Sequence, residues 1–295
     1  MDYKFPRRGL LLVMKIVVFD VETTGIPRQA GNYFKKIKSP SGTLTTQRNH
    51  RFRGEVIQIS ALESSLESPC VCERFLSHYT DPTEPISVGA TLNAHSISDQ
   101  PDCFRKGQEL RFAGDKNCSE ESLLAEGFKK LPYIRDLAKG KSLEHFLCDD
   151  PEFSKLFREP GTIFVGHNIS GFDMKVINDQ LLSSNCPQID FGLSISNGFE
   201  LQRVDPSRNY YFDTMKVGKF LLSEQIIKLT GKNKNPKLSE ALHCLGLEDD
   251  YVTQIAKQVV PGFSEETSYH NADFDVVTNW LVFILLLRKL QEVAV

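Results

Sequence analysis

The chain has 295 residues, of which 40% are hydrophobic and 25% are charged. This is the balance of an ordinary globular protein, and it excludes a disordered chain, a collagen-like repeat and a disulfide-stapled mini-protein. Lys and Arg number 35 against 38 Asp and Glu, so the net charge is -3. Any surface for nucleic acid must therefore come from local patterning, because the overall charge does not supply it.

The chain has seven cysteines, which is an odd number, and no two of them form a C-x-x-C pair. This pattern argues against a zinc site and against a secreted disulfide framework. We therefore expect reduced thiols and an intracellular location, in the cytoplasm or nucleus, rather than secretion. Residues 280–287 are all apolar, but a membrane-spanning helix needs about 20 such residues. They predict a buried helix and no membrane association.

Apolar, β-branched residues at 15–19 and 56–62 predict two buried strands, and a third strand is expected near 72–79. Met14 is a natural starting point, so residues 1–13 are expected to be an extension preceding one domain of residues 14–295. The connection between the first two strands, about residues 26–54, contains seven basic residues and no acid. Connections of this length are uncommon and are usually functional or disordered.

The second half of the chain alternates between expected strands and helices. Residues 105–160 are rich in charge and carry helical apolar spacing. Strands are expected at 162–165 and 210–214, and helices at 173–182, 238–245 and 272–290. This alternation predicts an α/β fold.

Carboxylates follow the first expected strand and begin two of the expected helices. Asp20 and Glu22 are two residues apart at the end of a strand, so their side chains point to the same face. Asp173 stands at the start of a helix, where the helix dipole alone would also favour an acid.

The segment of residues 270–275, HNADFD, is the most informative. Asn271 is suited to cap the helix that follows, with Asp273 in its first turn. Asp275 lies deeper, before a strongly apolar continuation, where an unpaired carboxylate would be costly. A bound metal ion would remove that cost. His270, taken alone, is equally explained as an ordinary surface or core histidine.

These acids and the histidine, in this order, resemble the DEDDh 3′→5′ exonucleases, a ribonuclease H-like family that includes the proofreading epsilon subunit of bacterial DNA polymerase III. The family's three motifs correspond to VVFDVETTG, VGHNISGFD and HNADFD in this chain. Three further segments, residues 92–104, 212–217 and 237–247, are similar to the family in the same order. The resemblance implies a mixed sheet of about five strands with helices on both faces, plus insertions at about 26–54 and 105–160.

The resemblance also implies two bound Mg²⁺ or Mn²⁺ ions. Two such cations, about 3.5–4 Å apart, stabilise both the attacking and the leaving oxygen of phosphodiester hydrolysis. Asp20 would bridge both ions. Glu22 and Asp275 would hold the ion that activates water, and Asp173 would help to position the other. His270 would be the general base.

Substrate contacts are implied for a second group of residues. By resemblance, Thr23 and Thr24 would contact the terminal nucleotide and His95 would lie near it, although a loop histidine often has no such role. Within the first insertion, Arg48, Arg51 and Arg53 would contact the phosphate backbone, unless the insertion is a solvated loop. A lesser basic patch contains Lys228, Lys232, Lys234 and Lys237.

The sequence thus predicts a metal-dependent 3′→5′ exonuclease that releases nucleoside 5′-monophosphates, with DNA the favoured substrate. The alternatives are an exoribonuclease trimming RNA 3′ ends and an inactive nucleic-acid-binding module. A phosphatase of the haloacid-dehalogenase type fits less well, because that scheme has no place for HNADFD. Expected partners are single-stranded nucleic acid or the 3′ ends of duplexes. A polymerase, another replication or repair protein, and a second copy of the chain remain open.

Overall fold

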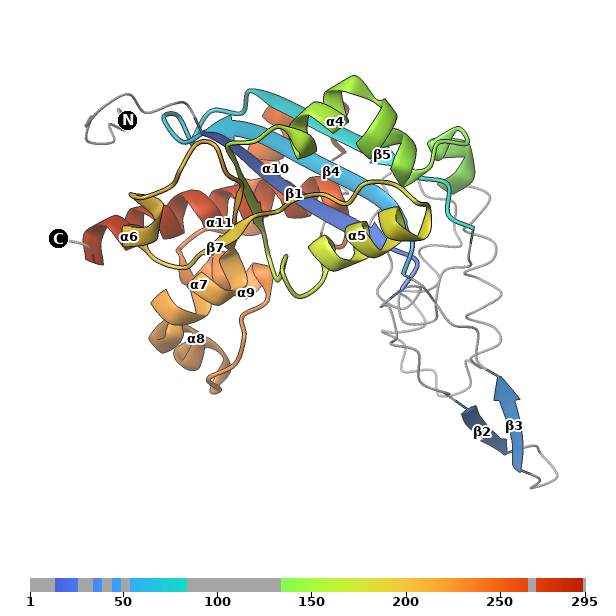
Figure 1. The fold of residues 1–295 in the computed structure, drawn as a ribbon. Helices are drawn as coiled ribbons and strands as arrows, with labels where there is room; N and C mark the ends of the chain where they lie inside the picture. Colours follow the sequence, from blue (N-terminus) through green and yellow to red (C-terminus); the bar gives the residue numbers. More distant parts are fainter. Residues whose placement is uncertain are drawn as a thin grey trace.

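A six-stranded sheet forms the centre of the molecule (Figure 1). The computed structural model describes residues 14–25, 34–38, 44–48, 54–83, 134–264 and 269–293. The strand order is β5-β4-β1-β6-β8-β7. These strands are β1 (Lys15–Thr23), β4 (Val56–Ser65), β5 (Arg74–Tyr79), β6 (Thr162–Gly166), β7 (Leu193–Ile195) and β8 (Tyr210–Asp213).

The sheet is mixed in direction. Strand β1 is antiparallel to β4, and β4 is antiparallel to β5. On the other side of β1, the pairs β1–β6, β6–β8 and β7–β8 are all parallel. The predicted mixed α/β sheet is confirmed, and the short edge strand β7 brings the number of strands to six instead of about five.

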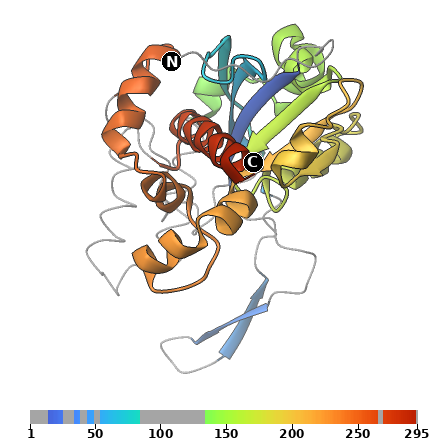
Figure 2. The same cartoon turned by 90° about the vertical axis from the view of Figure 1, so that its left-hand side faces the viewer.

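One face of the sheet is covered by helix α11 (Ala272–Val293). Around it lie α7 (Thr214–Leu221), α8 (Ser223–Thr230), α9 (Leu238–Cys244) and α10 (Asp249–Val259) (Figure 2). Ile16 and Val18 of β1 belong to the same apolar cluster as Trp280 and Phe283 of α11. The buried helix predicted from residues 280–287 is therefore confirmed.

The opposite face is covered by η1 (His145–Asp149), α4 (Pro151–Arg158) and α5 (Asp173–Ser183) (Figure 1). Here Phe19 of β1 meets Phe157 edge to face, with ring centroids 5.2 Å apart. Alternate residues of β1 thus enter two separate cores, as the twofold repeat of a strand requires. Residues 145–158, which the sequence places in an insertion, contribute directly to the second core.

The strand expected at 210–214 ends one residue early, because Thr214 begins α7. Asp213 caps that helix by accepting hydrogen bonds from the backbone N–H groups of Met215 and Lys216. A short helix, α6 (Gly198–Leu201), precedes β8.

The first insertion contains an antiparallel pair of strands that the sequence did not predict. They are β2 (Phe34–Lys38) and β3 (Leu44–Arg48), and they form a sheet of their own. Residues 1–13 and most of the second insertion, 105–133, lie outside the described residues.

Candidate active site

Asp20 and Glu22 stand at the carboxyl end of β1. Their side chains point to the same side of β1 as those of Ile16 and Val18, which is the face that α11 covers. Asp20 is half-buried and Glu22 is 9% exposed. The neighbouring strand places Ser60 opposite Asp20 and Gln58 opposite Glu22.

Asp173 reaches the same strand end from α5, of which it is the first residue. Its side chain is only 3% exposed. The backbone N–H of Val21, which lies between Asp20 and Glu22, donates a hydrogen bond to Asp173 Oδ1 at 3.2 Å. This contact, made across 152 residues of sequence, fixes the third carboxylate beside the first two.

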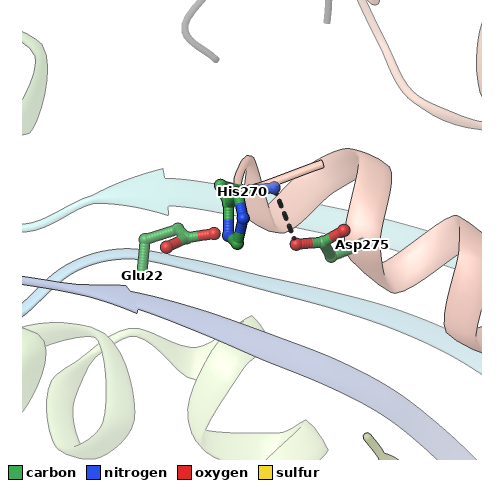
Figure 3. A group of neighbouring side chains, drawn as sticks. All are labelled: Glu22, His270 and Asp275. Atoms are coloured by element: carbon green, nitrogen blue, oxygen red, sulfur yellow. Dashed lines mark hydrogen bonds between the residues drawn. The ribbon is translucent and has the colours of Figure 1, made fainter. Parts of the chain in front are cut away.

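The start of α11 supplies the remaining two residues. Asn271 Oδ1 accepts a hydrogen bond from the backbone N–H of Asp273 at 3.0 Å, which confirms the predicted cap. The backbone of His270 is in the left-handed region, with φ of 68°. In this conformation its N–H donates to Asp275 Oδ2 at 3.0 Å. Figure 3 shows the imidazole of His270 between the carboxylates of Glu22 and Asp275.

Glu22, His270 and Asp275 form a set that could hold a metal ion. Each offers one ligand atom, and these atoms all lie within 4.8 Å of one another. Asp275 Oδ1 is buried and has no hydrogen-bond partner within the described part of the chain. Since a buried carboxylate oxygen without a partner is costly, this atom fits a cation ligand. Carboxylate oxygens are also the ligands that Mg²⁺ prefers.

The pKa values of three of these carboxyl groups, Asp20, Asp173 and Asp275, are raised. Burial raises the pKa of Asp20 well above its usual range, and the charges of Asp173, Asp275 and Glu22 raise it further. Burial and the charge of Glu22 likewise raise the pKa of Asp275. Burial raises the pKa of Asp173 to about 7, against the effect of hydrogen bonds from backbone N–H groups. Four acids held this close need a compensating cation to be ionised together at neutral pH.

A buried polar network ties the first turn of α11 to β4. Gln58 Oε1 accepts a hydrogen bond from the backbone N–H of Ala272 at 3.2 Å, and Ser60 Oγ donates to Asp273 Oδ1 at 2.5 Å. Gln58 and Ser60 are the residues that face Glu22 and Asp20 across the strand pair. The strand that pairs with the first two acids thus also positions the turn that carries Asp275.

A fifth carboxylate, Asp213, lies close to Asp173 at the end of β8. It is 2% exposed and accepts hydrogen bonds from the Asn168 backbone N–H and the Ser170 hydroxyl, at 3.1 and 2.8 Å. These contacts hold the loop that precedes Asp173. Asp213 was not predicted as a site residue, although it, like Asp20, stands at the carboxyl end of an apolar strand.

Gln58 and Ser60 were missed as well. Their signal was two polar side chains, two residues apart, within the otherwise apolar strand of residues 56–62. That alternation is also typical of a strand with one solvated face. Only the hydrogen bonds to the first turn of α11 show that these two polar side chains are part of the site.

The predicted substrate-contact residues are only partly visible. Thr23 is 6% exposed and its hydroxyl donates to the Gly25 carbonyl at 3.1 Å, while Thr24 is fully buried. Arg48 ends β3, but the structure does not describe its side chain. Residues His95, Arg51 and Arg53 lie outside the described residues. Their contacts with substrate stay predictions.

No protein-family model matches the chain, and no curated protein matches it. Among solved structures, it is similar to Escherichia coli exonuclease I in complex with a dT13 oligonucleotide, at 14% identity and a TM-score of 0.47. The alignment covers 95% of this chain and 42% of that one. The chain is also similar to the zinc-bound complex of E. coli exonuclease I with single-stranded DNA, at 14% identity and a TM-score of 0.44. That alignment covers 95% of this chain and 41% of the other. This chain spans less than half of those proteins, and a similarity so distant assigns it no activity.

The described helices include none that is both long enough and apolar enough to cross a membrane.

Proposed function

We propose that this chain is a metal-dependent 3′→5′ exonuclease that hydrolyses the terminal phosphodiester bond of nucleic acid, with DNA the favoured substrate. The observation that carries the proposal is the convergence of four acids, Asp20, Glu22, Asp173 and Asp275, at the carboxyl end of β1. One buried oxygen of this set, Asp275 Oδ1, has no hydrogen-bond partner among the described residues. The family resemblance implies the same four acids.

The four carboxylates would hold two Mg²⁺ or Mn²⁺ ions, with Asp20 as the shared ligand. When bound, such ions supply the positive charge that stabilises the attacking and leaving oxygens. Asp20 and Glu22 are fixed by β1, Asp173 by its hydrogen bond to Val21, and Asp275 by the N–H of His270. Each ligand is thus held by backbone before any cation arrives, which favours catalysis by a preorganised site.

His270 would act as the general base. Its side chain is exposed while the carboxylates are largely buried, so the imidazole can reach an attacking water at the edge of the cluster. A neutral imidazole can accept the proton of that water. The proton would then be shared with solvent, because the ring is accessible. Thr23, beside the acids, would contact the terminal nucleotide, whereas Thr24 is fully buried and would support that contact only from beneath.

The test is digestion of matched, 5′-labelled DNA and RNA oligonucleotides in the presence of Mg²⁺ or Mn²⁺. We expect shortening one nucleotide at a time from the 3′ end, release of 5′-monophosphates, and loss of activity in a chelator. A 3′-phosphate should block digestion. Cleavage of a circular strand, or digestion of the blocked strand, would contradict the proposal. Binding without any hydrolysis would instead support the inactive nucleic-acid-binding alternative.

A further inference from the structure

The segment of residues 214–237, which forms α7, α8 and the following loop, is strongly basic. It contains six lysines and one acid, Glu224, in a chain whose net charge is -3. Within the described residues, Lys219, Lys228 and Lys232 form no ion pair with an acid. These ammonium groups therefore lack neutralising partners in the described part of the chain and are suited to bind an anion.

The same segment also exposes apolar side chains. Phe220 is 73% exposed, Leu229 53% and Ile227 44%, and they make up three of the eight large hydrophobic side chains exposed among the described residues. The inner sides of the two helices are already buried through Val217, Leu222 and Ile226. The exposed apolar groups are therefore not needed for packing this domain.

This surface begins beside the candidate active site. Lys216 Nζ donates a hydrogen bond to Ser170 Oγ at 2.7 Å and lies 3.9 Å from Asp213 Oδ2. Ser170 belongs to the loop that ends at Asp173. Phe220 is four residues beyond Lys216 and shares its face of α7. It lies about 6 Å further along the helix axis.

We infer that the outer face of α7 and α8 binds single-stranded nucleic acid that leaves the active site, with Phe220 stacking on a base and Lys219 and Lys228 contacting phosphates. This inference rests on the proposed function. Exposed aromatic side chains flanked by cations are the combination that binds single strands without reading sequence. An acidic peptide or a second copy of the chain would also meet lysines. The link of Lys216 to Ser170 and Asp213, beside the acid cluster, favours nucleic acid over either of these.

The experiment measures binding of a 5′-fluorescein oligothymidine of about 16 nucleotides, in EDTA, by fluorescence anisotropy. Phe220→Ala should weaken binding about 5- to 150-fold, the effect of losing one stacked base. Phe220→Tyr should bind normally, whereas Phe220→Leu should not, because leucine keeps the apolar contact and loses the stacking. Leu182→Ala, at another exposed leucine of 60% exposure, is the matched control and should bind normally.

The lysines are tested through salt dependence. Each phosphate contact on a single strand contributes about 0.7 to the slope of log affinity against log salt, so Lys219→Gln with Lys228→Gln should lower the slope by about 1.4. The control pair Lys139→Gln with Lys155→Gln, on other elements, should leave it unchanged. Unaltered binding in the Phe220 and lysine variants, normal binding by Phe220→Leu, no binding by the parent chain, or a changed oligomeric state in sedimentation would each overturn the inference.

The two proposals fail separately. Hydrolysis by the unaltered protein, measured on end-labelled DNA with Mn²⁺, tests the nuclease activity alone. Oligonucleotide binding that depends on Phe220, without any hydrolysis, would contradict the proposed function but support the inferred binding surface. Hydrolysis by the parent chain together with oligonucleotide binding that Phe220→Ala does not change would contradict only the inferred binding surface.

Discussion

At the scale of single residues, Asp275 shows how a buried charge is tolerated at one site. One carboxylate oxygen receives the N–H of His270 at 3.0 Å, and the other is buried without a partner in the described residues. Glu22 and Asp173 add repulsion. A side chain in this position costs stability to the metal-free protein, so its retention is explained by a ligand that neutralises it.

Asp275→Asn should therefore raise the melting temperature of the metal-free protein while abolishing activity. The amide keeps an oxygen for the His270 N–H and removes a repelled charge, and each kcal/mol relieved raises the melting temperature by about 2 °C in a protein of this size. The rise in melting temperature that Mn²⁺ gives the parent protein should be lost. Calorimetry in EDTA and in Mn²⁺ checks both; a lower metal-free melting temperature would contradict this account.

His270 has two candidate roles that one substitution can separate. Its ring nitrogen lies within 4.8 Å of ligand atoms of Glu22 and Asp275, which would allow it to be a ligand as well as a base. As a base, His270→Ala should lower turnover about 10²–10⁴-fold and keep Mn²⁺ binding. Titration calorimetry with Mn²⁺ decides: loss of binding comparable to that of Asp275→Asn would make His270 a ligand.

At the scale of elements, the site depends on how α11 sits against β4. Gln58 is 1% exposed, and its side chain bonds both the backbone N–H of Ala272 and the carboxylate of Asp273. Since Gln58 also faces Glu22 across the strands, one residue sets the distance between acids from opposite ends of the sequence. Under the proposed function, Gln58 would be a positioning residue that acts through Asp275.

Gln58→Leu should lower kcat by about 10²-fold with little change in KM, because displacing a ligand by about 1 Å is enough for such a loss. It should also weaken Mn²⁺ binding. Thr278→Val is the matched control, because it removes a buried hydrogen bond within the same helix, from the Thr278 hydroxyl to the Phe274 carbonyl, without touching the tether. If the two variants lose stability equally and kcat equally, Gln58 has only a structural role.

The first insertion forms a hairpin of β2 and β3 with an acid-free, basic sequence. If it contacts phosphates, replacing Arg48, Arg51 and Arg53 together by Ala should lower the salt slope of oligonucleotide affinity by about 2, from three contacts of about 0.7 each. The loss should be similar for different sequences. Anisotropy in EDTA measures it, and an unchanged slope would make the insertion a solvated loop or a protein-binding surface.

At the scale of the whole molecule, the acid cluster couples folding to pH. Burial and neighbouring acids raise the pKa of Asp20, Asp173 and Asp275, that of Asp173 to about 7. A carboxyl group with a raised pKa favours the folded state while it is protonated. The stability that it contributes is complete below its unfolded pKa, about 3.9, and is lost as the pH rises through its folded pKa.

The metal-free protein should therefore melt at a lower temperature at pH 8 than at pH 6. Bound cations favour the ionised acids, so the increase in melting temperature given by Mg²⁺ or Mn²⁺ should be larger at pH 8 than at pH 6. Scanning calorimetry at both pH values, with and without metal, measures the four melting temperatures. In Asp275→Asn the difference between the two pH values should shrink. A metal-induced increase that is larger at pH 6 would contradict the assignment of these acids as ligands.

Much of this architecture follows from local sequence. The apolar run of β1, the cap at Asn271 and the buried α11 were predictable, because strand and helix periodicities and capping are properties of neighbouring residues. The order and spacing of the acids, by resemblance to a family, named the candidate site residues, and their roles stay predictions. Local patterns predicted neither the hairpin β2–β3 nor the place of residues 145–158 in the core. The helical spacing of Phe153, Leu156 and Phe157 is visible in the sequence, but such spacing does not say which surface a helix covers.

The sequence by itself thus determined most strands of the main sheet, the buried helix α11 and four acids that are candidates for chemistry. Only the tertiary structure decided that Asp173 bonds the backbone between Asp20 and Glu22, and that Gln58 and Ser60 join β4 to the first turn of α11. The physical reason is that these contacts depend on the register of β1 against β4 and on the packing of α11. Both are fixed by burial of side chains distant in sequence, to which a local pattern is insensitive.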